Sequence, residues 1–179
     1  MDKEILNKLS EEEALIRLKK YLADISFFNE ASFTLLPELA ILDYYVFSVM
    51  PKITGRMGEV TYLVNDEEIL NGQPDHFDKL MKKITENKLI LSIEIFAKLF
   101  FRMEDLRYGV ILEKPDGHAL IKAQQLPFSI FTPPSRNKTA DGVNYKFWFF
   151  DTDRLVPVFY DVLVNKQGEI KYTSQEFKN

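Results

Sequence analysis

The spacing of apolar residues changes once along the chain, and this change limits the fold more than any other feature of the sequence. In the first part, apolar residues recur at three- and four-residue intervals, as at Ile93, Phe96 and Phe100, which is typical of an amphipathic helix. In the last part, apolar residues lie in short alternating runs such as Tyr145–Asp151 and Val156–Val164, which is typical of strands. Helices and strands that are segregated along a chain predict an α+β fold.

Helix signals are concentrated in the first hundred residues. Ser10 followed by Glu13 forms a capping box, in which each residue satisfies a backbone amide at a helix start. Pro37 suits the first turn of a helix over Pro37–Val49. The alternative there is a buried strand, because the second half of that segment is rich in β-forming residues. The other predicted helices are Asp75–Asn87 and Leu89–Leu106.

The second part of the chain predicts an antiparallel meander of four to five strands. Lys114–Gly117 is a strong hairpin turn between the expected strands Tyr108–Glu113 and His118–Ala123. Thr132–Gly142, which contains two prolines and several polar residues, is expected to be a long exposed loop. The remaining expected strands of the meander are Tyr145–Asp151, Val156–Val164 and Glu169–Thr173. One further short strand, Val60–Val64, is expected among the helices.

These elements together predict one α+β domain over residues 1–179, with N-terminal helices packed on the C-terminal meander. The order of elements resembles that of the cone-shaped NTF2-like fold, in which helices cover a curved sheet and frame a pocket. The resemblance covers most of the chain but rests on topology alone. Because no motif residue carries it, it implies a fold and a pocket without an activity.

Several chemistries lack support in the sequence. There is no cysteine, which excludes disulfides, thiol nucleophiles and cysteine-ligated metals. The sequence has no GxSxG, P-loop or GxGxxG motif, and His76 and His118 do not share a metal-binding helix face. We therefore expect no cofactor and no metal. Whether the chain is an enzyme stays open at this stage.

Nucleic acid and membranes are also unexpected partners. The net charge is −4, which does not favour a phosphate backbone as the ligand. Gly55–Gly58 has the GxxG pattern of nucleic-acid-binding loops but carries one basic residue, so a plain turn is favoured. No apolar run reaches the roughly 18 residues of a membrane-spanning helix, and the charged N-terminus does not resemble a signal peptide. These features predict a soluble, cytoplasmic protein.

Charge is distributed unevenly. Residues 21–78 contain ten acidic and two basic residues, and residues 79–179 contain twelve acidic and sixteen basic residues. Acidic surface with aromatic anchors suits a basic protein partner, because charge steers association and rings provide contact area. Our leading hypothesis is a non-catalytic binding module of the immunity, inhibitor or adaptor type. Its candidate partner-binding residues are Phe27, Phe28, Glu30, Glu38, Asp43 and Tyr44.

Two other hypotheses stay open. One is a small-ligand-binding protein, or a hydrolytic or isomerising enzyme, whose pocket is lined by Tyr145, Phe147 and Phe149 between the helices and a curved sheet. The candidate acid–base residues are Asp151, Asp153, Asp161 and His118, because two close carboxylates shift each other's pKa values. The simpler interpretation is that Asp151–Arg154 forms a polar turn. The other hypothesis is a homo-oligomeric structural protein.

Overall fold

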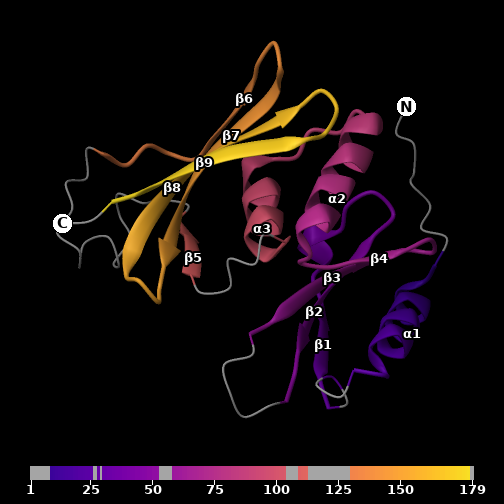
Figure 1. Cartoon of the computed structure of the whole chain (residues 1–179). Helices are drawn as coiled ribbons and strands as arrows, with labels where there is room; N and C mark the ends of the chain where they lie inside the picture. Colours follow the sequence, from indigo (N-terminus) through magenta and orange to yellow (C-terminus); the bar gives the residue numbers. More distant parts are fainter. Residues whose placement is uncertain are drawn as a thin grey trace. The chain divides into compact units, whose positions relative to one another are not determined.

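The structure is a computed structural model that describes residues 9–25, 28, 30–52, 58–103, 109–112 and 130–177. Its contacts divide the chain into two compact units (Figure 1). The N-terminal unit comprises Met1–Phe77 and Arg102–Arg107, and the C-terminal unit comprises Asp78–Phe101 and Tyr108–Asn179. The single domain expected from the sequence stays a prediction.

The N-terminal unit is a helix on a four-stranded antiparallel sheet of order β1-β2-β3-β4. The helix α1 (Glu11–Leu22) begins with the predicted capping box: the Ser10 hydroxyl accepts from the Glu13 amide at 3.3 Å, and the Glu13 carboxylate accepts from the Ser10 amide at 2.7 Å. The buried residues Leu18 and Leu22 of α1 pack against Phe47. The strands are β1 (Ser32–Leu35), β2 (Tyr45–Met50), β3 (Val60–Val64) and β4 (Ile69–Leu70).

The predicted helix over Pro37–Val49 is wrong. Pro37 starts only a single 3-10 turn, η2 (Pro37–Leu39), and the second half of the segment is strand β2. Strand β2 pairs on both edges, with β1 and with β3, which provides hydrogen-bond partners for its backbone; Phe47, for example, lies opposite Leu35 of β1 and Tyr62 of β3. Sheet pairing on both edges therefore outweighed the local helix signal of Pro37.

The C-terminal unit contains a five-stranded antiparallel sheet, with its helical residues drawn from α2 (Pro74–Glu86) and α3 (Ile93–Met103). The sheet order is β5-β7-β8-β9, and β6 also pairs with β7. The long strand β7 therefore has β6 along the first half of one edge and β5 along the second half. The strands are β5 (Gly109–Leu112), β6 (Ser135–Lys138), β7 (Gly142–Asp151), β8 (Val156–Asn165) and β9 (Ile170–Glu176).

Two sequence expectations change in this unit. Thr132–Gly142 is not only a loop, since β6 lies within it and pairs with Val143–Lys146 of β7. The side chains of β6 are mostly polar and exposed, so no apolar alternation signalled a strand. The helix expected from Leu89 begins instead at Ile93, where the Ser92 hydroxyl accepts from the Ile95 amide at 3.2 Å and caps it.

The face of α3 that packs on the C-terminal sheet is built from aromatic rings. Phe96 stacks on Tyr145 with ring centroids 3.8 Å apart, and Phe100 meets Phe147 and Tyr160 edge to face. Edge-to-face pairs of this kind add roughly 0.5–1.5 kcal/mol each beyond the area they bury. The α+β class and an antiparallel C-terminal sheet are thus confirmed. The predicted packing of the N-terminal helices on that sheet is matched only in part, because α1 packs on the N-terminal sheet.

The hairpin turn Lys114–Gly117 and the strand His118–Ala123 lie outside the described residues, as does most of Gly55–Gly58. Within the described part of the chain, no helix has both the length and the apolar character needed to cross a membrane.

Candidate functional site

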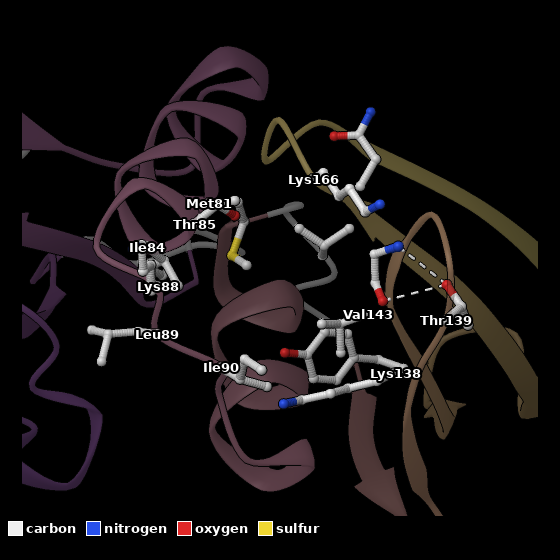
Figure 2. Close-up of a pocket in the computed structure, with 14 residues that line it drawn as sticks. Met81, Ile84, Thr85, Lys88, Leu89, Ile90, Lys138, Thr139, Val143 and Lys166 are labelled. Atoms are coloured by element: carbon white, nitrogen blue, oxygen red, sulfur yellow. Dashed lines mark hydrogen bonds between the residues drawn. The ribbon is translucent and has the colours of Figure 1, made fainter.

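A pocket of about 330 Å³ lies within the C-terminal unit. One wall comes from α2 and the loop that follows it, and the other comes from the β6–β7 hairpin and the β8–β9 turn (Figure 2). Pockets of this size and mixed lining are typical of small-molecule sites. The apolar lining residues are Met81, Ile84, Leu89, Ile90, Val143 and Val164.

The helix-side wall is shaped by the way α2 ends. The Leu89 amide donates to the Ile84 carbonyl at 3.0 Å, and the Lys88 amide donates to the Thr85 carbonyl at 2.9 Å. Together these bonds form a Schellman motif, which turns the chain and brings Leu89 toward Ile84. Lys88 has a φ of 57°, a left-handed conformation that costs a non-glycine residue roughly 1–2 kcal/mol. This cost is tolerated at a residue that lines the pocket.

The loop after α2 is fixed to the sheet through the Leu91 carbonyl. That oxygen accepts from the Arg136 guanidinium of β6 at 3.0 Å and from the Tyr145 hydroxyl of β7 at 3.4 Å. Tyr145 is 2% exposed and stacks on Phe96. Burial raises the pKa of Tyr145, so its phenol stays protonated near neutral pH and keeps donating. The loop after α2 is therefore fixed to strands β6 and β7 in the absence of a ligand.

The strand-side wall depends on the turn between β8 and β9. The Asn165 side-chain oxygen accepts from the Gln167 and Glu169 amides, both at 2.9 Å. Gly168 has a φ of 82° and sits so close to α2 that an added Cβ would lie 2.4 Å from the Lys82 Cα. The turn is therefore seated directly on the helix backbone, which places Lys166 in the pocket lining.

Three lysines, Lys88, Lys138 and Lys166, line this pocket, and the described lining contains no acidic residue. None of the three has an ion-pair partner among the described residues. Figure 2 shows the Lys138 side chain extending from the strand side toward Ile90. All three lysines are exposed, so together they give the rim of the pocket a positive potential that dissolved salt screens.

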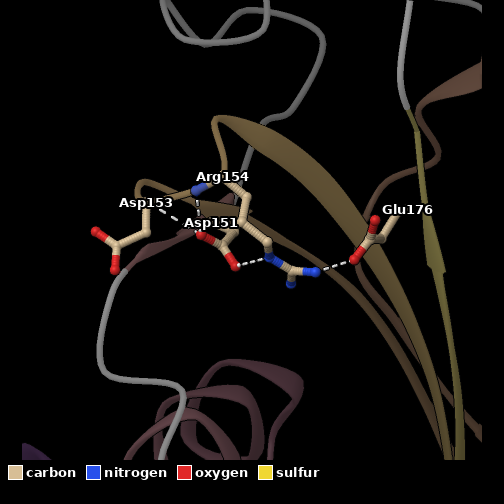
Figure 3. A network of polar contacts seen from close by, with 4 residues as sticks. All are labelled: Asp151, Asp153, Arg154 and Glu176. Carbon is tan, nitrogen blue, oxygen red and sulfur yellow. Dashed lines mark hydrogen bonds and ion pairs between the residues drawn. The ribbon is translucent and has the colours of Figure 1, made fainter.

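The candidate acid Asp151 is held in an ion-pair network at the β7–β8 turn (Figure 3). Its carboxylate accepts from the Arg154 Nε at 2.7 Å and from the Asp153 and Arg154 amides, and Arg154 also bonds Glu176. Burial opposes ionisation, but the bonds and charge of Arg154 outweigh it and lower the pKa of Asp151. The carboxylate is thus ionised near neutral pH, which does not suit a general acid, and its lowered pKa makes it a weak general base.

The structure does not bring Asp161 together with Asp151. Asp161 of β8 lies opposite Lys146 of β7 and shares its face of the sheet. Lys146 is five residues before Asp151, and side chains alternate between faces along a strand, so the two acids lie on opposite faces. The Asp161 carboxylate accepts from the Asn144 side-chain amide at 2.6 Å and lies 3.0 Å from the Lys146 ammonium. Burial again opposes ionisation, but these two partners lower the pKa of Asp161. Neither acid lines the pocket.

The other two catalytic candidates add no site. Asp153 is exposed in the turn that the simpler interpretation predicted. His118 lies outside the described residues. All three aromatic residues expected to line a cavity are buried. Tyr145 lines this pocket and Phe147 lines a separate one of about 310 Å³ beside α3, whereas Phe149 lines neither. Among the described residues, no group of three or more potential ligands could hold a metal ion.

The partner-binding candidates are divided between surface and core. Glu30 and Glu38 are exposed, and Phe28 is half-buried with its ring edge against Tyr62. Tyr44 is only 1% exposed and its hydroxyl donates to Glu68, so its ring is part of the core. Asp43 accepts from the Asn65 side chain at 3.1 Å. Phe27 lies outside the described residues.

Sequence reasoning missed the three lysines. Lys88, Lys138 and Lys166 are 28 or more positions apart and carry no motif. No sequence signal set them apart, because Lys138 and Lys166 each have an acid three residues later, Asp141 and Glu169. Their convergence depends on the α2 Schellman motif and on two strand turns.

No family model, curated protein or solved structure matches the chain. The resemblance to the NTF2-like fold therefore has no support beyond the order of elements.

Proposed function

We propose that this chain is a small-ligand-binding protein and that the pocket of the C-terminal unit is its binding site. One observation carries the proposal: the pocket of about 330 Å³ combines apolar side chains with a few convergent polar groups. This combination is typical of ligand sites, in which apolar contact gives affinity and polar groups fix orientation.

The fixed walls of the pocket support the proposal. Tyr145 and Arg136 hold the Leu91 carbonyl, and Gly168 holds the lysine-bearing turn on α2. A preformed site avoids the cost of ordering loops when the ligand binds. A catalytic role lacks comparable support, because Asp151 and Asp161 lie outside the described lining and have lowered pKa values.

The experiment is a ligand screen by saturation-transfer NMR, using small apolar molecules that include uncharged and charged members. Ile90 lines the pocket and is 38% exposed, so Ile90→Trp should fill the pocket without disturbing the core. We expect hits on the wild-type protein that disappear in this variant, while circular dichroism shows an unchanged fold. A screen without hits, or hits that persist in Ile90→Trp, would refute the proposal.

A second candidate function is the binding of a basic protein by the acidic surface of the N-terminal unit. The observation that favours it is the turn Asn65–Glu68, in which the buried Asn65 side chain holds the Glu67 and Glu68 amides at 3.0 and 2.8 Å and also contacts Asp43. This turn fixes acidic residues at the end of a strand. Exposed Glu30 and Glu38 add negative charge elsewhere on the same unit.

This second candidate is tested by affinity capture from source-cell lysate at low and high salt. Charge-steered binding weakens as salt screens the partners. We expect basic proteins to be retained at low salt, released at high salt, and lost with the double variant Glu30→Gln, Glu38→Gln. Capture that is the same for both proteins at both salt concentrations would argue against an acidic interface.

A further inference from the structure

The lining of the pocket is asymmetric, and this asymmetry specifies a class of ligand. Apolar side chains of Met81, Ile84, Leu89 and Ile90 come from α2 and the loop after it. Lys88 also lies on the helix side. The strand side contains the apolar residues Val143 and Val164 together with two lysines, Lys138 at the end of β6 and Lys166 in the β8–β9 turn. A ligand that satisfies both walls needs an apolar body on the helix side and a negative group on the strand side.

The lysines of this pocket differ from several other cations of the same unit. Lys98 pairs with Glu94 at 2.9 Å, Lys146 pairs with Asp161 at 3.0 Å, and Arg154 pairs with Asp151 at 2.7 Å. Among the described residues, Lys138 and Lys166 have no such partner although they line one pocket. The nearby Glu169 carboxylate is engaged by the Asn165 side chain at 2.7 Å. The positive charge at the strand-side wall is therefore left for a ligand.

The end of α2 decides where the negative group lies. The C-terminal end of a helix carries the negative end of its dipole, and α2 ends at Glu86 just before Lys88. Lys88 offsets this potential, so its net effect on an anion is smaller than that of the two strand-side lysines. Lysine ammonium groups act as point charges on flexible stems, and they need no bidentate partner. A single carboxylate-type head satisfies this arrangement.

We infer that the pocket takes an amphipathic organic anion, with its apolar body against α2 and its anionic head facing Lys138 and Lys166. This inference rests on the proposed small-ligand function and adds the chemistry of the ligand. The matched probes are octanoate, 1-octanol and octylammonium, which share a chain length and differ in the charge of the head.

The test is isothermal titration of the full chain with each probe at low salt. Octanoate should bind at one site about fivefold or more tightly than 1-octanol, since a charge-assisted contact contributes at least that much. Octylammonium should bind more weakly than 1-octanol because like charges repel. Octanoate affinity should fall as salt is added, whereas 1-octanol affinity should not.

Lysine-to-methionine variants locate the head, because methionine keeps an apolar stem and removes the charge. Lys138→Met and Lys166→Met should each weaken octanoate about threefold to tenfold, and leave 1-octanol affinity unchanged. Lys88→Met should have a smaller effect. The control Lys171→Met removes a lysine of β9 that is exposed and does not line the pocket, and it should change neither affinity.

The outcomes separate this inference from the proposed function. Equal binding of octanoate and 1-octanol by the wild-type protein would overturn the anionic head and leave the pocket as a ligand site. Octanoate binding that is unaffected by both Lys138→Met and Lys166→Met would do the same. Binding of no probe, or binding that persists in Ile90→Trp, would overturn the pocket itself. If a lysine variant fails to fold, the comparison of probes on the wild-type protein decides.

Discussion

Two turns of this protein are closed by the same asparagine hydrogen bonds but carry side chains of opposite charge. The acidic turn, Asn65–Glu68, joins β3 and β4, and the lysine turn, Asn165–Glu169, joins β8 and β9. In each, the asparagine side-chain oxygen accepts two backbone amides from the residues that follow. Asparagine favours this arrangement because its short amide can replace a backbone turn hydrogen bond. A local motif thus closes both turns regardless of the charge it carries.

The turns differ in what holds them to the rest of their units. Asn65 is 2% exposed and reaches Asp43 with its amide nitrogen, so the acidic turn is anchored by side-chain hydrogen bonds. The lysine turn is anchored by close backbone packing, with Gly168 against the Lys82 backbone of α2. One turn therefore depends on a buried polar group and the other on the absence of a side chain. The following predictions test this difference.

The largest effect is expected for Gly168→Ala. The new Cβ would collide with the α2 backbone, and the φ of 82° is unfavourable for alanine. We expect the free energy of unfolding to fall by about 2–4 kcal/mol, measured by urea denaturation. The control is Gly72→Ala, whose Cβ would lie an ordinary 3.5 Å from its nearest backbone oxygens and should cost less than about 0.5 kcal/mol. Equal costs for the two variants would mean that the lysine turn does not need its glycine.

A smaller effect is expected for the asparagines. Asn65→Ala leaves two amides of the acidic turn and the Asp43 carboxylate without a buried partner, and should lower the free energy of unfolding by about 2–3 kcal/mol. Asn165 is only half-buried, so in Asn165→Ala water can replace it as the acceptor for the Gln167 and Glu169 amides. This variant should lower the free energy of unfolding by about 1 kcal/mol. Chemical denaturation of both variants measures the difference. The reverse order would contradict the proposed difference in anchoring.

Lys88→Gly should stabilise the protein. Glycine adopts the left-handed conformation at the end of α2 without the strain that Lys88 bears at a φ of 57°, so the free energy of unfolding should rise by about 1 kcal/mol. Thermal unfolding measures the change. Lys88→Ala is the matched control, because it removes the same charge and keeps the strain. A similar gain in both variants would show that charge and not backbone conformation is responsible.

The smallest effect concerns Asp161 of β8, the strand that leads into the lysine turn. Its folded pKa lies below the ordinary value of 3.8, so its pair with Lys146 adds stability above that pH and loses it as pH falls through the folded pKa. Both partners are partly exposed, which limits the contribution to about 1 kcal/mol or less. Asp161→Asn should therefore cost stability at about pH 6 and nothing at about pH 2, measured by urea denaturation. A cost that does not depend on pH would mean that packing, not charge, is lost.

The sequence predicted the local parts of this structure well. The capping box at Ser10 and the strand Val60–Val64 are confirmed as predicted, because each depends on neighbouring residues alone. The helix over Pro37–Val49 failed because β1 and β3 supply partners that lie outside that segment. Strand β6 was missed because its mostly polar side chains give no apolar period, although its backbone pairs fully with β7.

The sequence by itself determined the α+β class and the antiparallel strands at the end of the chain, because hydrophobic periodicity acts over a few residues. It did not determine which charges meet. Asp151 and Asp161 looked like a cluster along the chain, and the strand register places them on opposite faces. Lys88, Lys138 and Lys166 looked unrelated, and the packing of α2 against the β8–β9 turn gathers them around one pocket. Register and packing couple residues far apart in sequence, so only the tertiary structure could place the candidate site.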